Sequence, residues 1–371
     1  MSARWYWIGF NHVAGVGPQR LKMLRQYFPT LEAAWHASAS DLRQAGLDRR
    51  TIANLQEARR TLDPHQLQNE IDNMGASTLT WDDLDYPPVL QELPDAPPVL
   101  YVRGSLAPAD NWAIAIVGTR KATTYGRDTA YQLAQGLVAA GLTIVSGLAL
   151  GIDAAAHQGA LEAGGRTIAV LPCGINKLYP PEHRQLAQQI IKQGALLTEF
   201  PPGTKAERKN FAPRNRIISG LSLGVIVVEA PNKSGALLTA DSAAEQGREV
   251  FAVPGQTTSS GSKGSNRLIQ DGAKLVMSVD DVLNELNLTR GTTQTRQEVQ
   301  QIAPENEQER ILLALISIEP YHIDDLCRKT DLPVATVSST LALMELKGMV
   351  RQVGHMQYTI AGGPAAPYTL G

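Results

Sequence analysis

The chain has 371 residues, of which 43% are hydrophobic and 19% charged, and its formal net charge is −2. This length exceeds what one small core needs, so we expect a globular protein of two or three domains. The net charge excludes a strongly basic nucleic-acid-binding protein but leaves room for a local basic patch. Cys173 and Cys327 lie far apart, which excludes a disulfide framework or a CxxC zinc site and favours a reducing cytoplasm.

The apolar stretches are too short for a membrane protein. The start, MSARWYWIGF, lacks the long apolar core of a signal peptide. The longest apolar run, around 217–228, is shorter than the roughly 18 residues of a membrane span, and Ser and Gly interrupt it. We therefore expect a cytoplasmic protein with no membrane partner. No metal or other cofactor is predicted.

Residues 1–75 are predicted to be helical. Residues 13–18, VAGVGP, form a tight glycine turn that opens a helix, and Pro18 suits its first position. A second such turn surrounds Gly46. The pair resembles the helix-hairpin-helix or SAM-like modules of DNA-processing proteins, in which backbone N–H groups can meet a phosphate. The alternative is a helical pair that only packs or mediates association.

An extended connector is predicted over residues 76–110. The prolines in 86–88 and 94–98 favour extended and turn conformations. Residues 99–104, VLYVRG, are expected to form a strand that leads into the main domain.

Residues 111–286 alternate between short apolar runs and helical stretches. The runs contain β-branched residues and little polar alternation, which is typical of strands buried on both faces. The fold class is therefore α/β, with a doubly wound, Rossmann-like parallel sheet. The predicted strands are 113–117, 143–146, 167–171, 195–199, 225–229, 249–253 and 274–277.

The C-terminal part is predicted to contain a second, small domain. Residues 287–306 are polar and rich in Thr and Gln, as in a flexible linker. Residues 307–361 show three helices and a hairpin, the pattern of a winged-helix domain, and 362–371 are expected to be disordered. The third helix, 334–347, carries one basic and one acidic residue. Because phosphate contacts supply most DNA affinity, a protein-interaction or accessory role is favoured over DNA reading.

Two glycine turns follow neighbouring predicted strands. Gly118-Thr119-Arg120, continued by Thr123, combines close backbone approach, a helix start and a guanidinium group. The second turn runs from Gly147 to Asp153, and Asp153 is expected to cap the following helix rather than to act in catalysis. Neither turn contains GxGxxG, GxxxxGK[ST] is absent, and Ser146 stands where a ribose-binding acid is expected. The first turn is therefore not a dinucleotide fingerprint, and the pattern argues against a P-loop NTPase.

A basic stretch at 203–216 surrounds Phe211 and follows another predicted strand. Basic groups beside an aromatic ring fit a single nucleic-acid strand, because the charges follow the backbone while a base stacks on the ring. The alternative is a solvated loop with Phe211 in the core, and with Asn215 and one arginine fixing loops. The basic side chains are Lys205, Arg208, Lys209, Arg214 and Arg216.

Three more turns lie at the same predicted sheet edge. They are 173–181 with Lys177, 234–240, and 261–267 with Lys263. Several such turns on one edge favour an extended polyanion over one small ligand.

The chain carries an ordered set of short motifs. They are GTR at 118–120, SGLA at 146–149 with GID at 151–153, FAPRNRII at 211–218, SG at 234–235 with TA at 239–240, VPG at 253–255, and NRLI at 266–269 with GA at 272–273. This set resembles the DprA family of DNA-processing proteins, also called Smf. The resemblance implies a non-enzymatic protein that binds single-stranded DNA without marked sequence preference. It further implies protection of incoming strands during natural transformation, loading of the recombinase RecA, and a homodimer formed through the Rossmann-like domain.

The predicted DNA site joins the residues of these turns with the positions that match the family. The family often has FPxRNR, whereas this chain has FAPRNR at 211–216. The predicted DNA-binding residues are Gly118, Thr119, Arg120, Thr123, Gly147, Lys177, Arg208, Lys209, Phe211, Arg214, Asn215 and Lys263.

Two other functions compete with this prediction. Nucleotide-hydrolysing enzymes of the lysine-decarboxylase-like group share the general sheet, but they carry PGGxGT with a following acid. This chain has VPGQTT at 253–258, without the glycine pair. The third hypothesis is a scaffold whose winged helix carries the function.

Overall fold

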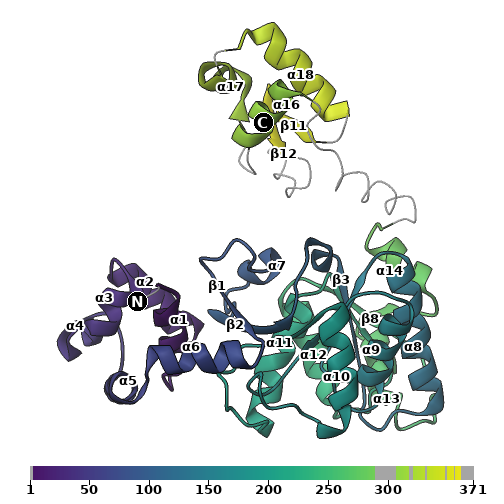
Figure 1. The fold of residues 1–371 in the computed structure, drawn as a ribbon. Coiled ribbons are helices and arrows are strands. Elements are labelled where there is room, and N and C mark those ends of the chain that lie inside the picture. Colours follow the sequence, from purple (N-terminus) through teal and green to yellow (C-terminus); the bar gives the residue numbers. More distant parts are fainter. Residues whose placement is uncertain are drawn as a thin grey trace. The chain divides into compact units, whose positions relative to one another are not determined.

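The computed structural model describes residues 3–288, 306–316, 321–330, 332–346, 349–354 and 356–360. The chain forms two compact units, Met1–Leu288 and Thr289–Gly371 (Figure 1). Nearly all of the predicted linker 287–306 and the whole tail 362–371 lie outside the described residues. None of the described helices has the length and apolar character that a bilayer crossing requires.

A nine-stranded sheet forms the centre of the larger unit. Its order is β1-β2-β6-β5-β4-β3-β7-β8-β9, and the seven strands from β6 to β9 in this order run parallel. These seven strands confirm the predicted α/β, doubly wound sheet. The strands are β1 (Ser77–Thr80), β2 (Val99–Gly104), β3 (Ala113–Val117), β4 (Thr143–Ser146), β5 (Thr167–Val170), β6 (Ala195–Thr198), β7 (Gly224–Val227), β8 (Glu249–Ala252) and β9 (Lys274–Leu275).

Segment 76–110, predicted as an extended connector, adds two strands to one side of the sheet. β2 pairs antiparallel with β6, where Tyr101 lies opposite Thr198, and β1 pairs antiparallel with β2. The strand predicted at 99–104 is confirmed. The pattern rules missed β1, because a four-residue strand shows too little periodicity to stand out.

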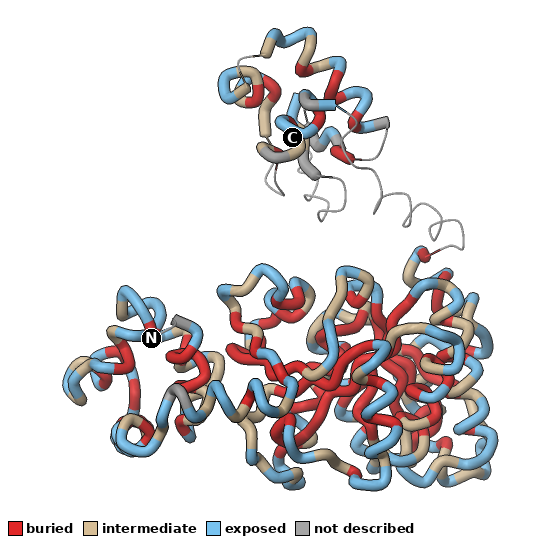
Figure 2. Tube along the Cα trace, viewed as in Figure 1, coloured by how far each residue is buried: buried red, intermediate tan, exposed pale blue. Residues whose placement is uncertain are grey.

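Helices cover both faces of the sheet, so its centre is buried (Figure 2). Along β3, Ala113, Ala115 and Val117 pack on the side of α11 and α12, whereas Ile114 and Ile116 pack on the side of α8 and α9. This period of two follows from the pleat of the strand. The helices of this part are α7 (Pro88–Gln91), α8 (Thr124–Ala139), α9 (Ile152–Glu162), α10 (Arg184–Gln193), α11 (Phe211–Gly220), α12 (Gly235–Glu245), α13 (Lys263–Gln270) and α14 (Val279–Glu285).

Six helices precede the sheet, which confirms the helical prediction for residues 1–75. Trp35 packs edge-on against Trp5 and Phe10, with ring centroids 4.9 and 5.1 Å apart. This core continues into the sheet, since Asn11 donates to the Glu199 carbonyl and accepts from the Tyr101 hydroxyl. The helices are α1 (Ala3–Asn11), α2 (Pro18–Tyr27), α3 (Leu31–His36), α4 (Ala39–Gln44), α5 (Arg49–Thr61) and α6 (Pro64–Asn73).

The smaller unit has its own core and a three-stranded sheet of order β10-β12-β11. Leu312, Leu326, Val337 and Leu341 are fully buried in it. The three helices and the hairpin confirm the winged-helix prediction, whereas the short strand β10 was not predicted. The elements are α16 (Glu307–Leu315), β10 (Tyr321–His322), α17 (Ile323–Thr330), α18 (Val334–Leu346), β11 (Val350–Gly354) and β12 (Gln357–Ile360).

Candidate nucleic-acid interface

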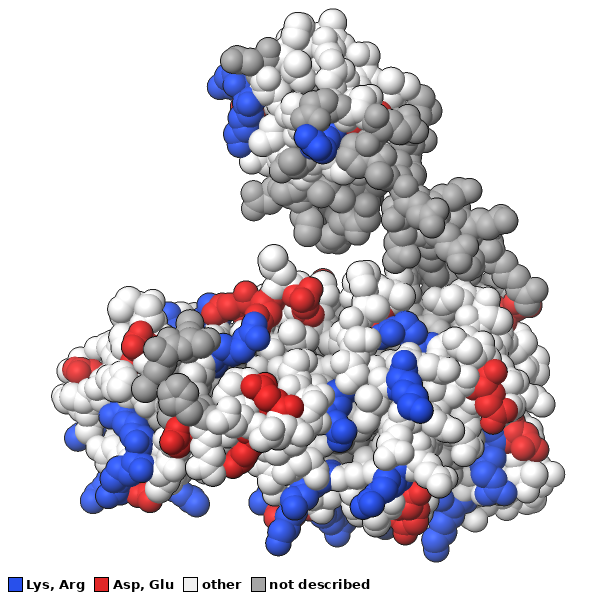
Figure 3. Space-filling model, in the orientation of Figure 1, with Lys and Arg blue, Asp and Glu red and all other residues white. Residues whose placement is uncertain are grey.

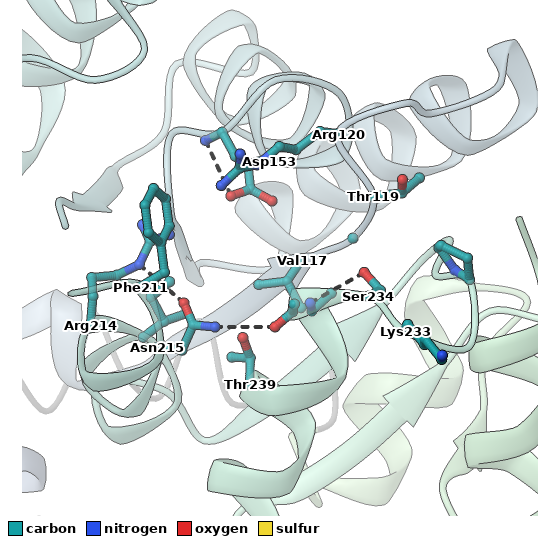
Figure 4. Close-up of a pocket in the computed structure, with 16 residues that line it drawn as sticks. Val117, Thr119, Arg120, Asp153, Phe211, Arg214, Asn215, Lys233, Ser234 and Thr239 are labelled. Carbon is teal, nitrogen blue, oxygen red and sulfur yellow. Dashed lines mark hydrogen bonds between the residues drawn. The ribbon is translucent and has the colours of Figure 1, made fainter. Parts of the chain in front are cut away.

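A cavity of about 330 Å³ lies where β3 ends and the helices α11 and α12 begin (Figure 4). The chain runs from β3 through β4, β5 and β6 to one side, then returns to β7 and runs to the other side. Loops that leave neighbouring strands in opposite directions open a crevice at the carboxyl ends of the strands. The sheet topology therefore produces a binding cavity at this point.

The loop after β3 forms one wall of the cavity. A Cβ atom on Gly118 would lie 2.5 Å from Ile152 Cγ1 and 2.9 Å from the Glu229 carbonyl oxygen, so a side chain does not fit here. The Thr119 N–H donates to the same carbonyl at 2.7 Å. This fixed loop presents Arg120 at the surface, with its Cζ atom 4.9 Å from the centroid of the Phe211 ring.

Phe211, the first residue of α11, lies close to two guanidinium groups. The Cζ atom of the buried Arg214 lies 5.8 Å from the ring centroid, and that of the exposed Arg120 lies 4.9 Å from it. Tyr179 meets the ring edge-on, with centroids 5.8 Å apart and an interplanar angle of 80°. Cations at such distances are attracted to the ring quadrupole. The ring is half-buried and held in place, so it can offer part of its surface to a ligand.

Arg214 is only 4% exposed, and its hydrogen bonds hold the cavity together. Its Nη1 donates to the Gly147 carbonyl at 2.7 Å and to the Val170 carbonyl at 2.5 Å, while Nε donates to Asn215 Oδ1 at 3.1 Å. Burial lowers the pKa of Arg214 to about 10. Gly147 touches this guanidinium closely enough that a Cβ atom would clash. Arg214 and Gly147 therefore support the site from below.

Asp153 supports the same region from the second glycine turn. Its Oδ2 accepts from the N–H groups of Gly147 and Ala149, at 3.1 and 3.2 Å. Burial raises the pKa of this carboxyl, and the charge of Arg214 acts against that shift. The predicted capping role is wrong, because Gly151 is the N-cap residue of α9 and Asp153 bonds back to the preceding loop. We call Asp153, Arg214 and Asn215 the buried network.

The start of α12 closes the cavity opposite Arg120. Asn215 Nδ2 donates to the Gly235 carbonyl at 3.1 Å, and the Ser234 hydroxyl caps α12 by accepting from Ala236 N–H. Lys233 lines the cavity and is exposed. The sequence prediction did not include Lys233. The sequence feature that could have identified it is a lysine directly before the serine that caps a helix, in the loop after a buried strand.

A second cavity, of about 790 Å³, adjoins the first and shares Arg120, Phe211 and Lys233 with it. Arg208 and the exposed Leu238 line this extension. The two together form a groove longer than one nucleotide pocket. We call Arg120, Arg208 and Lys233 the rim cations, since all three are exposed.

Seven of the predicted residues line this groove, and five lie outside its walls. Lys209 is paired with Glu207 at 2.8 Å, and Thr123 donates its hydroxyl hydrogen to Glu229. Lys177 is exposed after β5 and Lys263 begins α13, both at the carboxyl edge. The lining residues are Gly118, Thr119, Arg120, Arg208, Phe211, Arg214 and Asn215, and those outside are Thr123, Gly147, Lys177, Lys209 and Lys263.

The positive charge of the groove is local. Arg216, part of the predicted basic stretch, forms ion pairs with Glu199 at 2.5 Å and with Asp95 at 3.2 Å. Figure 3 shows Lys and Arg spread among Asp and Glu over the face drawn, and the net charge of the chain is −2. Attraction of a polyanion therefore depends on where the rim cations stand.

Two family models match the chain. The model described as DNA recombination-mediator protein A covers residues 77–287, and the DprA winged helix domain covers residues 296–354. The Protein Smf of Synechocystis sp. is 38% identical over 392 residues, covering 96% of this chain and 98% of that protein. The DNA processing protein DprA of Bacillus subtilis is 45% identical over 57% of this chain and 72% of its own length.

Solved structures agree with the family models. The DNA processing protein A of Streptococcus pneumoniae superposes with a TM-score of 0.68 at 37% identity, covering 76% of this chain and 97% of that one. The structure of DNA processing protein A from Helicobacter pylori is described for its single-stranded DNA binding mode. It superposes with a TM-score of 0.52 at 31% identity, covering 57% of this chain and 95% of that one. These matches confirm the resemblance drawn from the motifs. The chain belongs to the DNA recombination-mediator protein A family, which includes the DprA and Smf proteins.

Proposed function

We propose that this protein binds single-stranded DNA along the groove, without marked base preference, and delivers the strand to RecA. The observation that carries the proposal is the contact of Arg120 and Arg214 with the Phe211 ring at the switch point of the sheet. An exposed cation next to a fixed aromatic ring can bind a phosphate while the ring stacks on the neighbouring base.

The groove suits a strand better than a single nucleotide. Its two cavities share the wall made by Phe211, so a ligand can continue from one into the other. Base stacking on such a ring contributes about 1–3 kcal/mol per base, and each phosphate held by a rim cation adds a salt-dependent term. Neither contribution reads the identity of a base.

A hydrolytic function has less support from the same site. Asp153 is the one acidic residue among the described residues that line the first cavity. It is buried and accepts two backbone hydrogen bonds, so its carboxylate is occupied rather than directed at a ligand. We therefore favour binding over catalysis by this chain.

The family supports three finer proposals: a cytoplasmic role in natural transformation, RecA as the partner, and a homodimer. Leu275 in the edge strand β9 and Met277 just after this strand are exposed, and such apolar side chains suit burial against a second copy. The RecA proposal is tested by filament formation on a strand already bound by the protein. Slower filament growth than on the bare strand would count against it.

The DNA proposal is tested by polarisation of a labelled 20-nucleotide oligo(dT) with Phe211→Ala and Phe211→Tyr. We expect Phe211→Ala to weaken binding about 10-fold or more, and Phe211→Tyr to stay within about 3-fold of the wild type, because the ring persists. Unchanged affinity in a folded Phe211→Ala would contradict the stacking role.

A further inference from the structure

A separate cavity of about 530 Å³ lies on the far side of the loop that carries Arg120. Thr123 and Tyr125 come from this loop and the start of α8, Glu229 follows β7, and residues 254–262 supply the rest. The size is within the range of cavities that bind small molecules or single groups of a larger ligand. The groove around Phe211 shares none of these residues, although Thr123 is one of the predicted DNA-binding residues.

Glu229 brings a buried carboxylate to this cavity. It is 3% exposed, and its Oε2 accepts from the N–H and the hydroxyl of Thr123, at 2.9 and 3.0 Å. Oε1 has no hydrogen-bond or ion-pair partner within the described part of the chain. Oε1 packs against the backbone of Gly261, where an added Cβ atom would stand only 2.5 Å from it. One acceptor on a buried anion is therefore open to a ligand N–H group.

Tyr125 supplies an aromatic surface at the mouth of the same cavity. Its side chain is 56% exposed, yet its hydroxyl donates to the Pro254 carbonyl at 3.1 Å, which fixes the ring. A fixed, exposed ring is a platform for a nucleobase. The lining contains no lysine or arginine, so a phosphate is not the group that enters. Exposed lysines stand beside the lining in sequence, Lys121 and Lys263.

We propose that this cavity is a second base subsite of the same DNA strand and that it favours bases with an exocyclic amine. The proposal rests on the proposed function, since the strand has to cross the 118–125 loop from the Phe211 groove. The base stacks on Tyr125 and donates an amine hydrogen to Glu229 Oε1, with phosphates near Lys121 and Lys263. Guanine, adenine and cytosine offer such an amine, whereas thymine presents a carbonyl oxygen in its place. The resulting preference is modest because one contact carries it.

The test compares oligo(dC) and oligo(dT) of 20 nucleotides in polarisation titrations of the full chain. We expect the wild type to bind oligo(dC) about 5-fold more tightly. Glu229→Gln keeps an oxygen for Thr123 and turns an N–H₂ group toward the cavity, so the preference should fall to equality or reverse toward oligo(dT). A thermal melt verifies that this variant folds. A wild type without preference, or an unchanged ratio in folded Glu229→Gln, overturns the subsite.

Tyr125 provides a second, independent variant pair. Tyr125→Ala should weaken both oligonucleotides about 5-fold or more, whereas Tyr125→Phe keeps the ring and should stay near the wild type. If Tyr125→Ala leaves DNA affinity intact but weakens binding of RecA, the cavity takes a cationic side chain of a protein partner instead, and the proposal fails. Absence of any DNA binding by the wild type would refute the proposed function itself. Binding without these effects refutes the subsite alone.

Discussion

The two arginines that contact the Phe211 ring differ in their exposure and in their hydrogen-bond partners. Arg120 is exposed and makes its close contact with the ring, whereas Arg214 is buried and donates to two backbone carbonyls and to Asn215. A substitution in the rim cations should therefore alter ligand binding while the fold persists. A substitution in the buried network should alter the fold first, and binding only as a consequence.

The largest expected effect is on stability, from Arg214→Ala. This change leaves the carbonyls of Gly147 and Val170 without a charged donor and Asp153 without a compensating charge. We expect the free energy of unfolding to fall by about 3–5 kcal/mol in urea titrations. The matched control, Arg120→Ala, should change it by no more than about 0.5 kcal/mol. An equal loss of unfolding free energy in both variants would contradict the different roles assigned to the rim cations and the buried network.

The next effect is a pH dependence of stability from His157. Thr167 donates its hydroxyl hydrogen to the Ile144 carbonyl, so it accepts from His157 Nδ1–H at 2.7 Å, and Nε2 is buried without a hydrogen-bond partner among the described residues. Burial, followed by the charges of His183 and Arg214, lowers the pKa of His157 to about 3. Below the ordinary pKa of histidine, His157 is protonated in the unfolded chain but stays neutral in the folded chain. Lower pH therefore favours the unfolded chain and destabilises the fold.

We expect the free energy of unfolding to fall by about 2 kcal/mol from this group between pH 7 and pH 5. The variant His157→Gln cannot titrate, and it should lose this part of the pH dependence. Urea titrations at both pH values give the comparison. The same slope in wild type and variant would assign the acid sensitivity to other groups.

A smaller effect, confined to binding, is expected for Arg120→Ala. Loss of one phosphate contact should weaken oligo(dT) about 10-fold and reduce the slope of log affinity against log salt by about 0.7. Arg120→Lys keeps the charge and should restore the slope, though not the flat contact with Phe211. A full slope in Arg120→Ala would mean that this guanidinium meets no phosphate.

The smallest effect concerns Lys209, which stands just outside the groove. Its ion pair with Glu207, at 2.8 Å, lowers the pKa of that carboxyl and occupies the lysine. Glu207→Gln should free Lys209 and tighten oligo(dT) binding about 2-fold at low salt, with the gain disappearing as salt rises. An unchanged affinity of Glu207→Gln for oligo(dT) would show that Lys209 does not contact DNA.

The sheet could be predicted from the sequence because its signal is local. Runs such as 113–117 and 143–146 are short, aliphatic and followed by glycine turns, and each became a parallel strand. β1 could not be predicted, because its place in the sheet depends on pairing with β2 across eighteen or more residues of chain. Pairing over such distances leaves no periodic mark in the sequence.

The site was predictable by type of residue but not by role. Arg120 and Arg214 were predicted to lie on the groove because each follows the end of a predicted strand. The sequence did not show that one side chain is exposed and the other buried. That difference arises because Arg214 projects from α11 toward the ends of β4 and β5, where it donates to the carbonyls of Gly147 and Val170. Lys233 was missed because a lysine before a helix cap is usual on any surface.

The measurement that tests the central claim most directly is a salt titration of labelled oligo(dT) and a matched duplex against the full chain. We predict tighter binding of the single strand, with log affinity falling by about 2 for each tenfold rise in salt if the three rim cations each hold a phosphate. Equal binding of strand and duplex, or an affinity that salt does not change, would contradict a groove that stacks bases on Phe211 between rim cations.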